Sequence, residues 1–386
     1  MNMSEEAANA TAANAVNDFT FDVYRELRGS KGNLFFSPYS ISSALAMTWA
    51  GAGGETALEM ARALRFDNAG AESLHAGMKE LRERFNSMPE DSGTLAVANR
   101  LWLDESENLL PDYAAMVESN YGAGAERVDF MFETEKARET INHWVEQITR
   151  DKIKDLLRPG NLSPITRLVL TNAIYFNSVW DKPFKKSNTK EKPFFTGKGK
   201  QKDVLMMYQD EYFLYGEEPG LQWVKLPYKI RGFSLMIFLP RENESFTQLE
   251  ELEDKLTSGA YSAWAAGMQR RKVMLHMPKF KNEGRYMLKE ILMKLGMKLA
   301  FTEAADFSGM TEGLVRIDSV IHQTFIELNE EKTEAAATAV GMVMAGSAIR
   351  MPEPPPVEFR ADHPFVYFLT DDVTGVILFM GRMTSP

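Results

Sequence analysis

The sequence of 386 residues contains no cysteine and only five histidines. Without cysteine the chain can form no disulfide, thiol nucleophile or cysteine-ligated metal site. The histidines do not stand at metal-ligand spacing with one another or with a pair of carboxylates; they are His75, His143, His276, His322 and His363. We therefore expect no metal site and no cofactor.

Short catalytic motifs are also missing. Neither Gly-x-Ser-x-Gly nor His-Glu-x-x-His occurs, and Gly197–Lys200 lacks the spacing of a phosphate-binding loop. A Ser-His-Asp triad can be assembled from distant positions, so sequence order alone does not exclude one. Since no motif supports catalysis, we expect a protein that is not an enzyme.

The chain has fewer basic than acidic residues, and it contains no long apolar run. The net charge of −10 argues against a nucleic-acid partner. The densest basic stretch, Lys182–Lys202, is more typical of a solvated strand and loop than of a polyanion site. No segment is long and apolar enough to span a membrane. Residues 1–17 have neither the basic head nor the apolar run of a signal peptide, so a cytoplasmic protein is possible.

Hydrophobic periodicity predicts mixed α and β structure, with helices mostly in the first half and strands in the second. Helical spacing predicts helices near 9–28 and around 141–148. Ser37-Pro38 is a helix start, and the helix should stop at Gly51, Gly53 and Gly54. Strands are expected at 94–103, 167–176, 233–239 and 376–380, the last three of them buried on both faces. No linker or repeat divides the chain, so we expect one domain over 1–386.

The segment from Asn329 to Ala345 begins acidic and then runs into small residues. Every second residue from Thr333 to Ala345 is small or modest in size, so a strand here would present one thin face. Such a strand could fit between two strands that already cover a core. The alternative is an alanine-rich helix, which local propensity favours. Gly341 and the prolines at 352, 354, 355 and 356 argue against a long helix.

The flanking motifs resemble those of the serpin family, in the family's order and at similar spacing over about 14–383. The resembling segments are Asn33–Leu45, Leu170–Phe176 with Trp180 after it, His276–Phe280, Ala305–Met310, Glu330–Ala339 and His363–Phe365. The resemblance implies an α+β serpin fold with three β-sheets, about nine helices and an exposed reactive-centre loop at about 331–356. It also implies a serine-protease inhibitor that acts as a suicide substrate.

The resemblance assigns roles to three groups of residues. The hinge, where the loop leaves the main sheet, matches Glu330, Glu331, Lys332, Thr333, Glu334, Ala335, Ala336, Ala337, Thr338 and Ala339. The shutter, a polar cluster beneath the strands that part, matches Ser37, Ser40, Asn172 and His322. The breach, where the loop first enters, matches Trp180, Lys279 and Glu330. Considered alone, Asn172 and His322 could be ordinary core residues with satisfied hydrogen bonds, and Lys279–Glu330 a surface ion pair of little energetic weight.

Two features leave the function and the reactive bond open. Lys332 stands where the family hinge usually has glycine, which keeps a non-inhibitory serpin, such as a carrier, chaperone or storage protein, as the alternative. Counting forward from Glu330 places the reactive bond at Gly346-Ser347. Counting back from Val357–Phe359 places it at Arg350-Met351.

By resemblance the partner is a target serine protease held in a covalent acyl complex, or in some members a cysteine protease. The chain is expected to be monomeric. The family default places it outside the cell.

Overall fold

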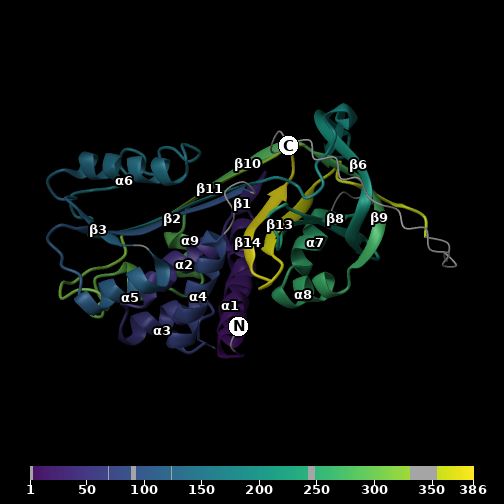
Figure 1. Cartoon of the computed structure of the whole chain (residues 1–386). Helices are drawn as coiled ribbons and strands as arrows, with labels where there is room; N and C mark the ends of the chain where they lie inside the picture. The colour runs from purple at the N-terminus through teal and green to yellow at the C-terminus, as the bar shows by residue number, and fades with distance from the viewer. Residues whose placement is uncertain (1–2, 68, 88–92, 123, 242–247, 331–353) are drawn as a thin grey trace.

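The computed structural model describes residues 3–67, 69–87, 93–122, 124–241, 248–330 and 354–386, with side chains from residue 10 onward. Helices gather in the first half of the chain and strands in the second (Figure 1). The α-helices of the described residues are α1 (Met3–Leu27), α2 (Pro38–Trp49), α3 (Gly54–Ala63), α4 (Ala71–Asn86), α5 (Pro111–Tyr121), α6 (Thr134–Ile148), α7 (Gln248–Lys255), α8 (Ser258–Ala266) and α9 (Lys289–Lys294). None of them is long and apolar enough to cross a membrane.

Five strands form the sheet that carries the candidate site, in the order β10-β11-β4-β2-β3. They are β2 (Gly93–Asp104), β3 (Ala125–Val128), β4 (Leu168–Ser178), β10 (Phe280–Met287) and β11 (Ser319–Leu328). The central pair, β4 and β11, is parallel, whereas β2 and β10 run antiparallel to their inner neighbours. A parallel pair needs a long crossover, and here residues 179–318 lie between the two strands.

The other strands form a nine-stranded sheet whose two parts share the long strand β6. In one part, β5 and β9 pair with residues 200–215 of β6, and β12 pairs with β9. The other part continues from residues 214–218 of β6 through β7, β8, β13 and β14 to β1. Together with the five-stranded sheet, these two parts give the three sheets expected. The bounds are β1 (Leu34–Phe36), β5 (Lys190–Gly197), β6 (Lys200–Glu218), β7 (Leu221–Pro227), β8 (Phe233–Pro240), β9 (Gln269–Pro278), β12 (Val357–Arg360), β13 (Phe365–Asp371) and β14 (Ile377–Met383).

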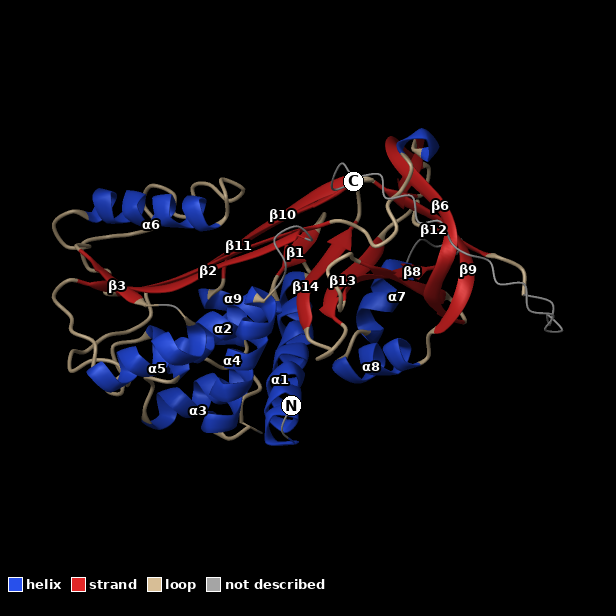
Figure 2. Cartoon of the chain, viewed as in Figure 1, coloured by secondary structure: helices blue, strands red, loops and turns tan. Residues whose placement is uncertain are grey.

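Both faces of the five-stranded sheet are covered. Figure 2 shows α6 on one face and the helices of the first half, α2 to α5, on the other. Alternation along β4 sends Leu168, Leu170 and Ile174 into the large core and Val169 and Ala173 into the smaller core under α6. The prediction that this strand is buried on both faces is therefore confirmed.

The local signals in the sequence place α2 correctly. Ser37 caps the helix, accepting a hydrogen bond from the Ser40 N–H at 3.2 Å, and Pro38 occupies the first position, where no amide proton is needed. The helix ends at Trp49, just before the predicted glycines. Its buried face rests on β2, β4 and β14 and so lies under the centre of the five-stranded sheet.

Candidate functional site

A row of polar side chains crosses the five-stranded sheet in register. Asn99 of β2 is paired with Asn172 of β4, Asn172 with His322 of β11, and His322 with Tyr286 of β10. Asn172 and His322 are fully buried, and Asn99 is nearly so. The buried polar groups on β2, β4 and β11 need partners, and they find them in one another and at the start of α2, whereas the half-buried Tyr286 accepts the backbone N–H of Phe35.

The contacts of His322 define its protonation state. Its Nε2 accepts the backbone N–H of Ser37 at 2.9 Å, which leaves the proton on Nδ1, and Nδ1 donates to Oδ1 of Asn172. Burial lowers the pKa of His322 to about 3, against an opposing contribution from the hydrogen bond with Asn172. The ring is therefore neutral over the physiological pH range and serves as one donor and one acceptor across the β4–β11 seam.

The predicted shutter residues Ser37, Ser40, Asn172 and His322 are thus brought together. The Asn172 amide donates to Ser40 Oγ at 2.6 Å and to Asn99 Oδ1 at 2.5 Å. Asn99 in turn accepts from Ser40 Oγ at 3.0 Å and donates to the Ser40 carbonyl at 3.1 Å. Asn99 was not among the predicted residues, although a signal was present: it falls on the same strand face as Leu95, Val97 and Leu101.

The pairing of β4 with β11 stops before either strand ends. The register runs from Ser319↔Val169 to Phe325↔Tyr175, and no inserted strand separates these residues. Beyond them, described residues 176–178 of β4 pair with β2, and 326–328 of β11 pair with β10, but not with each other. The sheet is therefore closed at its centre and open at one end.

The predicted breach residues surround this open end. Trp180 donates its indole N–H to the Asn329 carbonyl at 2.9 Å and stacks on Tyr228 at 4.5 Å between ring centres. Lys279 Nζ lies 2.8 Å from Glu330 Oε2, and the Glu330 side chain is only 6% exposed. Burial by itself would raise the pKa of Glu330, but polar contacts, chiefly that with Lys279, outweigh it and leave that pKa below its ordinary value. The pair is half-buried and therefore not an ordinary surface ion pair.

The remaining predicted positions, those of the hinge and the reactive bond, come after β11 in the sequence. Of the hinge, only Glu330 is described; Glu331 to Ala339 and both candidate reactive bonds, Gly346-Ser347 and Arg350-Met351, lie outside the described residues. The chain is described again from Pro354 and forms β12, which pairs in parallel with β9. The two ends of the predicted loop are thus held at Glu330, on the five-stranded sheet, and at Val357, on the nine-stranded one.

A buried polar row thus lies beneath a parallel strand pair whose pairing stops before the strands end. A family model described as "Serpin (serine protease inhibitor)" matches residues 14–386. The chain belongs to the serpin family, most of whose members are protease inhibitors.

Relatives are similar over almost the whole chain. Leukocyte elastase inhibitor of Xenopus tropicalis is 40% identical over 97% of this chain and 99% of its own, and a serpin-like protein of Thermococcus kodakarensis is 40% identical over 99% of this chain and 87% of its own. Uncleaved ovalbumin superposes with a TM-score of 0.87 at 30% identity, covering 97% of this chain and 100% of its own. The names of these relatives do not support the expectation that the protein lies outside the cell.

Proposed function

We propose that this chain inhibits a serine protease as a suicide substrate. The protease attacks the reactive-centre loop, at about 331–356, and forms an acyl-enzyme. The cut loop then inserts between β4 and β11 before water reaches the ester. In this proposal residues 1–386 act as one monomeric serpin domain, and deformation of the protease's oxyanion hole stalls deacylation.

The observation that supports this proposal best is the partial pairing of β4 with β11. The strands are hydrogen-bonded from Ser319 to Phe325 and separate beyond, at the end from which Glu330 leads into the loop. A strand entering there meets described segments of β4 and β11 that are not paired with each other. It can then extend by replacing the hydrogen bonds between β4 and β11 with bonds of its own to both strands. Ser40, Asn99 and Asn172 in the polar row beneath each have more than one partner, so some of their bonds can be exchanged as the strands part.

The small face of the loop supports the same proposal. Thr333, Ala335, Ala337 and Ala339 would turn toward the core on insertion, and none is bulky or charged. The names of the relatives, leukocyte elastase inhibitor and serpin B6, point to an inhibitor as well. Of the two reactive bonds we favour Gly346-Ser347, because the length inserted sets how hard the tethered protease is pulled, and this bond lies at the family's usual spacing from Glu330. Arg350 is then a substrate-like cleavage site.

The direct test mixes the protein with trypsin-, chymotrypsin-, elastase- and subtilisin-like enzymes. We expect a covalent complex that survives boiling in detergent with at least one of them, and none with the same enzyme when its active-site serine is blocked beforehand. Mass spectrometry of the released peptide distinguishes cleavage after Gly346 from cleavage after Arg350. Cleavage by the whole panel without any covalent complex would contradict the inhibitor.

The second candidate is a non-inhibitory serpin. Lys332, in place of the usual hinge glycine, favours it, because a long charged side chain in the hinge opposes the change of backbone angles that insertion requires. The structural likeness extends to thyroxine-binding globulin complexed with its ligand, with a TM-score of 0.86 at 27% identity. Such a protein would be cleaved by the panel and would gain no stability from the cut.

A further inference from the structure

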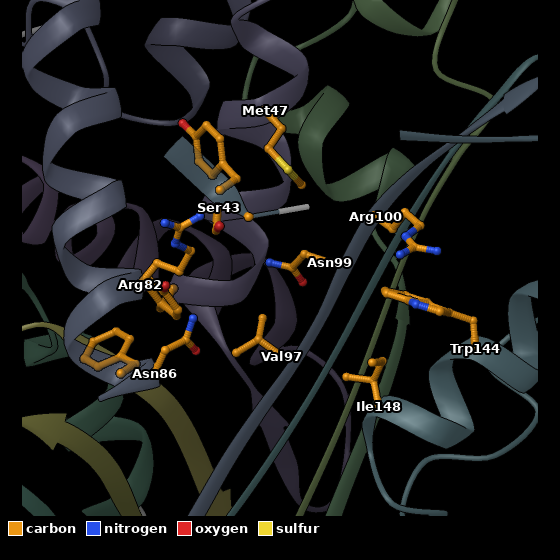
Figure 3. A pocket seen from close by; sticks show the side chains of 13 residues that line it. Ser43, Met47, Arg82, Asn86, Val97, Asn99, Arg100, Trp144 and Ile148 are labelled. Carbon is orange, nitrogen blue, oxygen red and sulfur yellow. The ribbon is translucent and has the colours of Figure 1, made fainter. Parts of the chain in front are cut away.

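A cavity of about 230 Å³ lies around the edge of β2. Strand β3 pairs with β2 only at Leu101–Asp104, so within the described residues the edge from 93 to 100 has no neighbour on that side. Figure 3 shows the cavity's residues on both sides of this edge: Arg82 and Asn86 of α4 on one side, and Arg100 with Trp144 of α6 on the other. The site is separate from the β4–β11 seam but shares Asn99 with the polar row.

The charge in this cavity is of one sign. Of the residues that line it, Arg82 and Arg100 are the charged ones, and no carboxylate is among them. The Nε of each is buried and has no hydrogen-bond partner in the described part of the chain. Their ion pairs, Arg82 with Glu83 and Arg100 with Glu126, are with more exposed carboxylates that do not line the cavity. Because each Nε is shielded even from water, an acceptor in the cavity would bond the terminal nitrogens of these guanidinium groups.

Packing holds both arginines in place. The guanidinium carbon of Arg100 lies over the Trp144 ring, 4.2 Å from its centre, which is a cation–π contact. Arg82 lies against Gly122, where an added Cβ would meet its Nη1 at 2.5 Å. Gly122 also ends α5 in the left-handed conformation, with φ 60°, so glycine serves both needs here. Burial lowers the pKa of Arg100, which reflects the cost of a poorly solvated cation that a bound anion would offset.

The other walls are apolar or neutral. Val97, Phe85, Met47 and Ile148 offer apolar surface beside the Trp144 ring, and Asn86, Asn99 and Ser43 offer amide and hydroxyl groups. The volume lies below the about 300 Å³ at which pockets for drug-sized ligands begin, so only a compact molecule fits. An inorganic anion would leave the apolar walls uncovered, and a neutral apolar molecule would leave the two guanidinium groups of the lining without an anion in the cavity.

We propose that this cavity binds a small amphipathic carboxylate, with the anion on Arg82 or Arg100 and an aromatic or short aliphatic body against Trp144 and Val97. The proposal does not depend on protease inhibition. A carboxylate accepts charge-assisted hydrogen bonds from a guanidinium, and these are stronger than bonds between neutral groups. The occupant would also fill the space beside Asn99, so its binding should stabilise the native arrangement of β2.

The test uses phenylacetate, benzoate and hexanoate as probes, with binding measured by calorimetry and by the shift in melting temperature. Phenylacetamide, which has the shape of phenylacetate without its charge, and sulfate, which has charge without an apolar body, are the comparison ligands. We expect saturable binding of at least one carboxylate, and binding at least tenfold weaker in Arg82→Met or Arg100→Met. Arg127→Met is the matched control, because Arg127 lies on β3 and bonds Asn108 outside the cavity.

Ile148→Trp is a second kind of variant, because it fills the cavity from a half-exposed position and keeps both arginines. It should abolish binding in a protein whose melting temperature without ligand is unchanged, which guards against misfolding of the arginine variants. Three results would each overturn the proposal: no saturable binding of any of the three acids up to about 10 mM, equal binding of phenylacetate and phenylacetamide, or equal binding of phenylacetate and sulfate.

Discussion

His322 joins the two halves of the five-stranded sheet through hydrogen bonds on both ring nitrogens. One bond reaches the Ser37 backbone in α2, and the other reaches the Asn172 side chain on the neighbouring strand. Separation of β4 from β11 must break the second bond and leave a buried amide oxygen to be satisfied elsewhere. In the proposed mechanism this residue would therefore contribute to the barrier that keeps the sheet closed.

Replacement of His322 by alanine should lower this barrier. The change leaves the Asn172 oxygen and the Ser37 N–H without their partner, at a cost of about 1–3 kcal/mol for each buried group. We expect faster loss of inhibitory activity on warming, as the loop inserts spontaneously, with the initial protease preference unchanged. The measurement is residual inhibition against incubation time, and His143→Ala, on the exposed face of α6, is the control. Identical decay of His322→Ala and the parent would make His322 an ordinary core residue.

The lowered pKa of His322 gives a second expectation at this scale. An unfolded histidine titrates near 6.5 and His322 near 3 in the fold, so between these values the unfolded chain binds more protons. Stability is fully present above about pH 6.5 and falls as the pH falls toward about 3, by up to about 1.4 kcal/mol per pH unit. His75 and His276, whose pKa values burial lowers to about 4, act in the same direction.

The variant His322→Gln isolates the contribution of His322 to this pH dependence of stability, because His75 and His276 remain unchanged in it. We expect its urea midpoint to fall less steeply than that of the parent as the pH is lowered from 7 to 4. Parallel curves for the two proteins would mean that His322 is not buried neutral in the fold.

Several of these residues could be predicted from the sequence, because a polar residue on an apolar strand face needs a partner wherever it lies. That reasoning identified Asn172 and His322, each on its own strand, but did not identify the polar residue on the next strand. Asn99 carries the same signal on the strand 94–103, among Leu95, Val97 and Leu101. Only the register shows that it stands beside Asn172, since sequence spacing within one strand says nothing of the residue opposite.

At the scale of elements, the strands with unbroken apolar runs were predicted nearly to their ends, for example 167–176 against the observed Leu168–Ser178. Helices with a side-chain cap, such as α2, were predicted equally well. The pairing of β4 with β11 could not be predicted from residue patterns alone, because about 150 residues separate Asn172 from His322 in the chain. Parallel partners at that separation are chosen by the packing of the whole domain, and here the family resemblance supplied what the local pattern could not.

The loop is the element whose faces can be tested by matched changes. If it inserts as a strand, Ala337 faces the core and Ala336 faces away, because side chains alternate. Ala337→Arg would bury an unpaired guanidinium, which is costly, so insertion should lose its race with deacylation and the inhibitor should become a substrate. Ala336→Arg is the control and should keep most of the covalent complex. The ratio of complex to cleaved protein, read from a denaturing gel, measures both; equal losses would mean that the faces are assigned wrongly.

At the scale of the whole molecule, the fold holds its core in two layers on either side of a sheet that is closed only in part. The large core and the smaller core under α6 both include side chains of β4 and β11. A sixth strand between them would extend both layers at once and complete the hydrogen bonding of the open end. In the proposed mechanism the uncut protein would be a kinetically trapped state, in which the connection at both loop ends opposes a more stable arrangement.

Cleavage of the loop should therefore raise stability substantially. A strand of about a dozen residues gains roughly 1 kcal/mol net for each backbone hydrogen bond, so a gain on the order of 10 kcal/mol is expected. That corresponds to a rise in melting temperature on the order of 20 °C. The measurement is thermal unfolding, by circular dichroism, of the intact protein and of the protein cut within 331–356 by a protease that it does not trap. Ala337→Arg cut at the same bond is the control and should gain much less, since its loop is hindered from inserting. An intact and a cut parent that melt together would contradict insertion and favour the non-inhibitory serpin, while leaving the carboxylate site beside β2 untouched.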